Sequence, residues 1–188
     1  ALLPGGADVA LAGRLASANG VQRFEGSVEL AADNFRELLA WLGAALPSLP
    51  QDRLRRASLA AKLVAQPERI DIASLDLSFD ATRVRGAATV VLHQRIGIGA
   101  RLALDRLVLE PYLAAFAGGG GGGLPLDLNV DAAVDLLTWR GVNLGGVKLA
   151  AVLQQDAVTV REASVKDLAG ATASASGELK DGRVRGAV

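Results

Sequence analysis

Residues 58–92, SLAAKLVAQPERIDIASLDLSFDATRVRGAATVVL, contain three runs in which apolar residues alternate with polar or small ones. A period of two places alternate side chains on one face of a β-strand. The breaks at Gln66-Pro67-Glu68 and Asp80-Ala81-Thr82 are typical of turns. The alternation slips by one residue at Ala73-Ser74, as it does at a β-bulge. This stretch therefore predicts a three-stranded meander with one apolar face.

Most of the remaining chain repeats this pattern. Similar alternations predict strands at about 8–15, 23–30, 96–104, 126–136, 147–153, 158–165 and 171–179, with a second phase slip near Glu162-Ala163. Segments that open with Leu59 and Leu149 both continue into a turn, a β-branched pair and a slip, which indicates a weak internal repeat. We predict a mainly β fold, in which antiparallel meanders form a curved sheet that is either groove-like or closed into a sandwich.

One segment changes to the helical period. Asn34 and Glu37 form a plausible capping box. The apolar residues that follow recur at helical spacing and precede two prolines; they are Phe35, Leu38, Leu39, Leu42 and Leu46. We predict an amphipathic helix at 35–46 that packs on one end or face of the sheet. A helix lying in a membrane interface would need a more basic polar face.

Six consecutive glycines at 118–123 predict a linker, because ordering glycine costs the most backbone entropy. The linker divides the chain into a meander with the helix, residues 1–117, and a second meander, residues 124–188, that we expect to continue the same sheet. The chain contains no methionine, even at its first position, so we expect it to be an excerpt from a longer protein.

The composition excludes several functions. Lys plus Arg and Asp plus Glu both total 20, so the basic excess needed to bind nucleic acid is absent, and the cluster at Arg53, Arg55 and Arg56 more often solvates a turn. The chain has no cysteine, which excludes thiolate metal sites, and its single histidine, His93, excludes a multi-histidine metal site. No apolar run is long enough to span a membrane as a helix, and no basic segment of a signal peptide is visible.

Residues of catalytic type do not form a convincing site. His93 lies at a predicted strand end, and Asp71 and Asp76 fall opposite the apolar positions of their strand, which predicts a solvated face. The row Asp127, Asn129 and Asp131 lies along a strand, whereas a calcium site needs a turn and further oxygen ligands. The glycine run lacks the residues of a phosphate loop. We predict a protein that is not an enzyme and has no metal or cofactor.

Hydrophobic residues make up 51% of the chain but aromatic residues only 4%, so its apolar surface is almost entirely Leu, Val and Ala. Such a lining is typical of a smooth, continuous apolar surface, although a core of small residues in a sandwich would have the same composition.

Several segments, in this order, resemble the AsmA family of bacterial envelope proteins. They are FEGSVEL (24–30), NFRELLAWLGAALP (34–47), SLAAKL (58–63), LDLSFDATRVRGAATV (75–90), LALDRLVLEPYL (102–113), LTWRGVNLGGVKLAAVL (137–153) and VTVREASVKDLAGATASASGEL (158–179). The order of the segments is the specific part of this resemblance, since none of them is a catalytic signature.

The resemblance implies a Gram-negative periplasmic protein, held in the inner membrane by an N-terminal helix outside this excerpt. It also implies a β-groove that binds phospholipid acyl chains or conducts them between membranes, as in bridge-like lipid-transfer proteins. The residues expected to line the groove are Leu59, Leu63, Ile70, Ile72, Leu75, Leu77, Val84, Val90, Leu102, Leu104, Val130, Val147 and Leu149. The alternative is a passive structural module of the envelope that affects assembly of outer-membrane proteins. An open groove could also self-associate through its exposed edges.

Overall fold

The computed structural model describes residues 2–18, 20–41, 43, 49–112, 126–154, 157–168, 170–180 and 183–187. The first half contains β1 (Leu2–Leu3), β2 (Ala7–Ala18), β3 (Val21–Ala32), α1 (Phe35–Trp41), β4 (Ala57–Gln66), β5 (Arg69–Phe79), β6 (Thr82–Leu92) and β7 (Ile96–Val108). The second half contains β8 (Leu126–Trp139), β9 (Val142–Gln154), β10 (Ala157–Leu168), β11 (Ala171–Lys180) and β12 (Arg183–Ala187).

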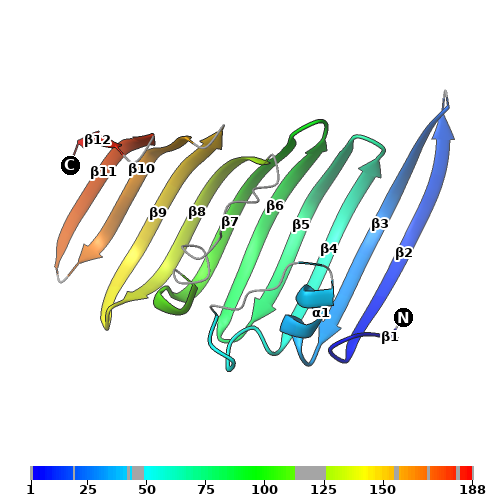
Figure 1. The fold of residues 1–188 in the computed structure, drawn as a ribbon, viewed down its shortest axis with the longest axis horizontal. Helices are drawn as coiled ribbons and strands as arrows, with labels where there is room; N and C mark the ends of the chain where they lie inside the picture. The colour runs from blue at the N-terminus through cyan, green and yellow to red at the C-terminus, as the bar shows by residue number, and fades with distance from the viewer. Residues whose placement is uncertain are drawn as a thin grey trace.

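The twelve strands form one sheet in which spatial order follows chain order from β1 to β12 (Figure 1). The prediction of a mainly β fold with a curved, groove-like sheet is confirmed. The described residues contain no second sheet facing this one, so the chain forms the open alternative and not a sandwich.

Neighbouring strands are antiparallel except β7 and β8, which pair in parallel from Ile96 opposite Leu126 to Val108 opposite Thr138. The two meanders therefore share one sheet. Because these two strands run in the same direction, the C-terminal end of β7 and the N-terminal end of β8 lie at opposite ends of the strands, and the connection must cover that distance. The predicted glycine linker at 118–123 lies outside the described residues.

Both predicted phase slips are β-bulges. Ala73 and Ser74 of β5 form the first, because Ile72 pairs with Ala88 while Leu75 pairs with Gly86. In β10 the register against β9 shifts between Val160 and Glu162, one residue before the predicted position. In each bulge the extra residue compensates for the one-residue change in the alternation. The apolar side chains before and after the bulge therefore lie on the same face of the sheet.

Helix α1 begins at Phe35 as predicted, and the Asn34 side-chain amide donates to the Glu37 carboxylate over 3.4 Å. Gly43 has a φ of 83° and donates its N–H to the Ala40 carbonyl. A residue in this left-handed conformation ends an α-helix. The helix is therefore shorter than the predicted 35–46, although Leu42 and residues 44–48 lie outside the described part of the chain.

The side chain of Leu38 fixes α1 on the sheet. It is 2% exposed and packs with Ala7 of β2 and Ala32 of β3. Partly buried apolar residues surround this small core; they are Leu3, Leu30 and Phe35. Figure 1 shows α1 near the strand ends at the β2–β4 side of the sheet.

Candidate functional site

The apolar side chains form rows that cross the sheet. Directly opposite residues on neighbouring strands point to the same face, so the pairing register defines each row. The first row crosses ten strands; it contains Val9, Leu30, Leu59, Leu77, Val84, Leu104, Val134, Val147, Val165 and Ala173. Every member is aliphatic, so this row is an unbroken apolar line.

Three further rows lie parallel to the first on the same face. The second contains Leu11, Val28, Ala61, Leu75, Gly86, Leu102, Ala132, Leu149, Ala163 and Ala175; the third contains Gly13, Gly26, Leu63, Ile72, Ala88, Ala100, Val130, Ala151, Val160 and Gly177; the fourth contains Leu15, Phe24, Ala65, Ile70, Val90, Ile98, Leu128, Leu153 and Val158. We call these four rows together the apolar face.

All thirteen residues expected to line a groove lie on the apolar face. The first row holds Leu59, Leu77, Val84, Leu104 and Val147; the second holds Leu75, Leu102 and Leu149; the third holds Leu63, Ile72 and Val130; the fourth holds Ile70 and Val90. The register thus brings together residues up to 90 positions apart in the chain, from Leu59 to Leu149.

Much of the apolar face is uncovered. Among the predicted lining residues only Val84 is buried, at 5% exposure, whereas Leu149 is 41% exposed and the others are partly exposed. Leu11 and Leu15 are 64% and 71% exposed. Single exposed leucines are common on proteins, but a contiguous apolar surface is typical of a binding surface.

The rows differ in bulk. The first and fourth consist mostly of Val, Leu and Ile, while the second and third contain many Ala and Gly residues. A Cβ at Gly86 would overlap the Arg101 carbonyl oxygen, and the Phe24 ring lies 2.7 Å or less from the Cβ positions of Gly13 and Gly26. Phe24 therefore covers the glycine pair of β2 and β3, as aromatic residues do beside glycines near sheet edges.

The Asp80 carboxylate connects three segments of the chain, a role that the sequence pattern did not predict. Both Asp80 oxygens accept from the Leu54 N–H, at 2.9 and 3.0 Å, and one also accepts from the Tyr112 hydroxyl at 2.7 Å. The Tyr112 ring packs edge-on against Phe79, with centroids 5.9 Å apart. These contacts tie the segment before β4 and the segment after β7 to the β5–β6 turn.

This arrangement changes the ionisation of Tyr112. Burial, followed by the hydrogen bond to Asp80 and the charge of that carboxylate, raises the pKa of the phenol above its usual value of 10.0. The neutral phenol is therefore the form that the folded chain stabilises.

The opposite face is polar and carries ion pairs between strands. Arg83 contacts Asp76 at 2.6 Å, and Arg161 contacts Asp131 at 2.7 Å. The hydrogen bond from Arg83 lowers the pKa of the Asp76 carboxyl. Asp71 has a lowered pKa because it accepts from Arg69 and, next in size, from Thr89. These positions agree with the predicted solvated face for Asp71 and Asp76.

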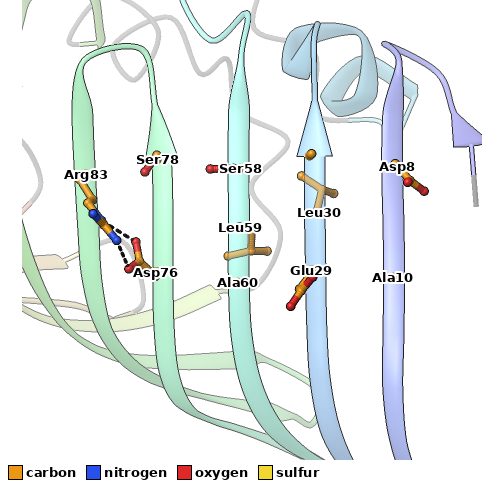
Figure 2. A pocket seen from close by; sticks show the side chains of 11 residues that line it. Asp8, Ala10, Glu29, Leu30, Ser58, Leu59, Ala60, Asp76, Ser78 and Arg83 are labelled. Carbon is orange, nitrogen blue, oxygen red and sulfur yellow. Dashed lines mark hydrogen bonds and ion pairs between the residues drawn. The ribbon is translucent and has the colours of Figure 1, made fainter.

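The structure describes hollows on this polar face. Figure 2 shows one of about 440 Å³, which crosses β2–β6 and contains the Arg83–Asp76 ion pair. Its lining residues are Asp8, Ala10, Glu29, Leu30, Ala31, Ser58, Leu59, Ala60, Asp76, Ser78 and Arg83. Since the hollow is open and its polar side chains, charged residues and two serines, are all exposed or partly exposed, we assign it no ligand.

No protein-family model, curated protein or solved structure matches this chain. The function is therefore argued from the residues and their geometry.

The remaining candidate residues do not form a site. His93 is exposed at the end of β6 and lies 3.7 Å from Glu68. Asp127 pairs with Arg95, and Asn129 and Asp131 both accept from Arg161. Within the described ranges no three side chains of metal-binding type gather, and no helix is long and apolar enough to cross a membrane.

Proposed function

We propose that this chain is a segment of a periplasmic envelope protein whose apolar face binds phospholipid acyl chains and conducts them between membranes. The observation that supports this proposal best is the unbroken run of four apolar rows, which cross nine or ten strands. The proposal is one of binding and not of catalysis, and several charged residues form ion pairs with one another on the other face.

The dimensions of the face suit extended acyl chains. Ten strands spaced about 4.8 Å apart make a row roughly 43 Å long, and four alternate positions span about 20 Å along a strand. Burying an acyl chain against such a surface contributes about 0.8 kcal/mol for each methylene group removed from water.

The bulk of the rows favours chains that run across the strands. The bulky first and fourth rows flank the smaller second and third rows, so a chain along the long axis of the sheet meets the larger side chains on both sides. Such a path follows the direction from β2 to β11 and passes the lining residues Leu63, Ile72 and Leu102.

The polar face makes this arrangement possible in water. Because the strands satisfy one another's backbone groups, a single layer needs no second sheet for hydrogen bonding. Ion pairs such as Arg83–Asp76 and Arg161–Asp131 keep the other face hydrated. One face can then remain free for lipid.

The cellular setting rests on the resemblance to the AsmA family. Two of the segments that carry it, FDATRVRG and WRGVNLGGVKL, coincide with turns that begin at Asp80 and Arg140. That resemblance supports a periplasmic location in a Gram-negative bacterium and an inner-membrane anchor elsewhere in the full-length protein.

A structural module of the envelope that affects outer-membrane protein assembly is the second candidate, and one observation favours it. Leu107, Leu137 and Leu144 form a row of leucines on the face that carries the ion pairs. Beyond it Trp139 and Val142 are exposed, and the Arg140 guanidinium stacks 5.3 Å from the Trp139 ring. Exposed aromatic and arginine residues are typical of protein contacts.

Native mass spectrometry of the purified chain, with organic extraction of copurified lipid, tests the lipid proposal. We expect phospholipid at a defined stoichiometry, and its loss in Leu102→Asp. The matched control is Ala103→Asp, which places the same charge on the next residue and the opposite face. A lipid-free chain that also fails to bind a fluorescent phospholipid would favour the structural module, as would equal retention of lipid by both variants.

A further inference from the structure

Strand β2 has a long edge that no described strand covers. On its outer side the described residues of β1 pair with Ala7 and Asp8, whereas the inner side pairs with β3 from Asp8 to Ala18. The β2–β3 register has no shift, and residues 10–17 contain no proline and one charge, Arg14. Natural edge strands usually carry bulges, prolines or several charges that prevent pairing. This edge has none of these protections apart from Arg14.

The exposed apolar side chains add to the argument. Leu11 and Leu15 have the largest exposed fractions among the large hydrophobic residues of the described chain, and both lie on the apolar face of β2. A strand added at this edge would cover them and would pair with the backbone of residues 10–16 of β2.

We infer that β2 pairs antiparallel with β2 of a second copy of this chain, with Gly13 opposite Gly13 on the two-fold axis. A two-fold axis perpendicular to the sheet keeps the apolar faces on one side. Opposite residues must then share a face, so the axis lies midway between the two copies of one residue. A centre at Leu11 places Leu15 opposite Ala7, which β1 occupies, and a centre at Leu15 places Leu11 beyond the end of β2. The centres that pair both leucines are therefore Ala12, Gly13 and Arg14.

Charge and space select Gly13. An axis at Arg14 places two guanidinium groups opposite each other, and like charges directly opposite destabilise a strand pair. Since β1 occupies the outer edge at Ala7 and Asp8, an axis at Ala12 leaves room to pair residues 10–14, whereas an axis at Gly13 leaves room to pair residues 10–16. The axis at Gly13 places Leu11 opposite Leu15 and Ala12 opposite Arg14, and Ala10 meets Ala16.

This pairing extends the apolar face without a step. The third row reaches the edge at Gly13 and continues through Gly13 of the second copy, while Leu11 and Leu15 complete the second and fourth rows. The inference concerns assembly and does not require lipid, so it stands or falls separately from the lipid proposal.

A charge pair at position 12 tests the register. Ala12 is exposed and would face Arg14 of the second copy twice in each dimer. We expect the unmodified chain to be a dimer by sedimentation equilibrium in lipid-free buffer. Ala12→Lys should weaken dimerisation about tenfold, and Ala12→Glu should strengthen it by a similar factor. A monomeric parent chain, open-ended polymers that join β2 to β12, or equal association of both variants would overturn the inference.

Disulfide trapping checks the same register without relying on charge. The chain has no cysteine, so Leu11→Cys with Leu15→Cys introduces the only thiols. Within one strand these positions are about 13 Å apart, too far for a disulfide, whereas opposite positions are about 5 Å apart. We expect an oxidised covalent dimer from the double variant and none from Leu11→Cys alone. Equal trapping by both, or by neither, contradicts the Gly13 axis.

Discussion

Gly86 is the residue at which the backbones of β6 and β7 leave no room for a side chain. An added Cβ would overlap the carbonyl oxygen of Arg101, whereas a Cβ at Gly99 in β7 would meet open space. We expect Gly86→Ala to lower the free energy of unfolding by about 1–3 kcal/mol, because the two strands must move apart. Gly99→Ala is the control and should be neutral or stabilising by up to about 1 kcal/mol. Urea denaturation measures both, and equal effects would show that the close approach is absent.

Tyr112 gives the stability a pH dependence at the alkaline end. Its folded-state pKa is raised above 10.0, so the folded chain holds the phenolic proton more tightly than the unfolded chain does. This contribution is complete below pH 10 and is lost as the pH rises above it. We expect Tyr112→Phe to flatten the alkaline fall in unfolding free energy while retaining the ring contact with Phe79. Because Tyr112 is the single tyrosine, its phenolate absorbance titrates this group alone, and a midpoint at or below 10 contradicts the assignment.

The bulge at Ala73 and Ser74 is the element that keeps β5 on one face. Deleting Ala73 would force either Ile70 and Ile72 or Leu75 and Leu77 onto the polar face, since a one-residue slip reverses every side chain. We expect the deletion to lower the unfolding free energy by about 3 kcal/mol or more, because it also turns Asp71 or Asp76 toward the apolar side. Ala73→Gly retains the extra residue and should cost about 1 kcal/mol or less. Thermal unfolding followed by circular dichroism compares the two, and a deletion as mild as the glycine variant would contradict the role of the bulge.

At the scale of the strands, alternation predicted most of the fold. In a strand with one apolar face the apolar residues must recur with period two, and a bulge appears as a single break in that period. Strands and bulges can therefore both be predicted from the sequence. The end of α1 was less readable, because the apolar spacing continues to Leu46 although Gly43 adopts a left-handed conformation. The parallel pairing of β7 with β8 was not predicted, since the direction of β8 depends on the path of the long connection that precedes it and not on the pattern within either strand. The contacts of Asp80 with Leu54 and Tyr112, 26 and 32 positions away, required the folded structure for the same reason.

At the scale of the molecule, the absence of a shared core in the described residues governs how the chain unfolds. Each strand makes its extensive contacts with the strands next to it in the sheet, and the small core under α1 lies at one end. Such architectures behave as nearly one-dimensional arrays whose parts differ in stability. Such a chain is therefore less bound than a globular domain to unfold in a single two-state transition. We expect the α1 end and the β8–β9 turn to unfold at different urea concentrations.

The two tryptophans can test this expectation separately, because Trp41 lies in α1 and Trp139 lies at the end of β8. Trp139→Phe leaves Trp41 as the reporter of the α1 end, and Trp41→Phe leaves Trp139 as the reporter of the β8–β9 turn. Both tryptophan residues are more than 40% exposed, so each substitution should leave the circular dichroism transition of the parent chain unchanged. Different fluorescence midpoints would show that a signal at one end of the sheet does not report on the other. If both fluorescence midpoints equal that of circular dichroism, the whole sheet unfolds as one unit. The backbone hydrogen bonds between strands would then be sufficient to make unfolding cooperative, including across the parallel β7–β8 pair.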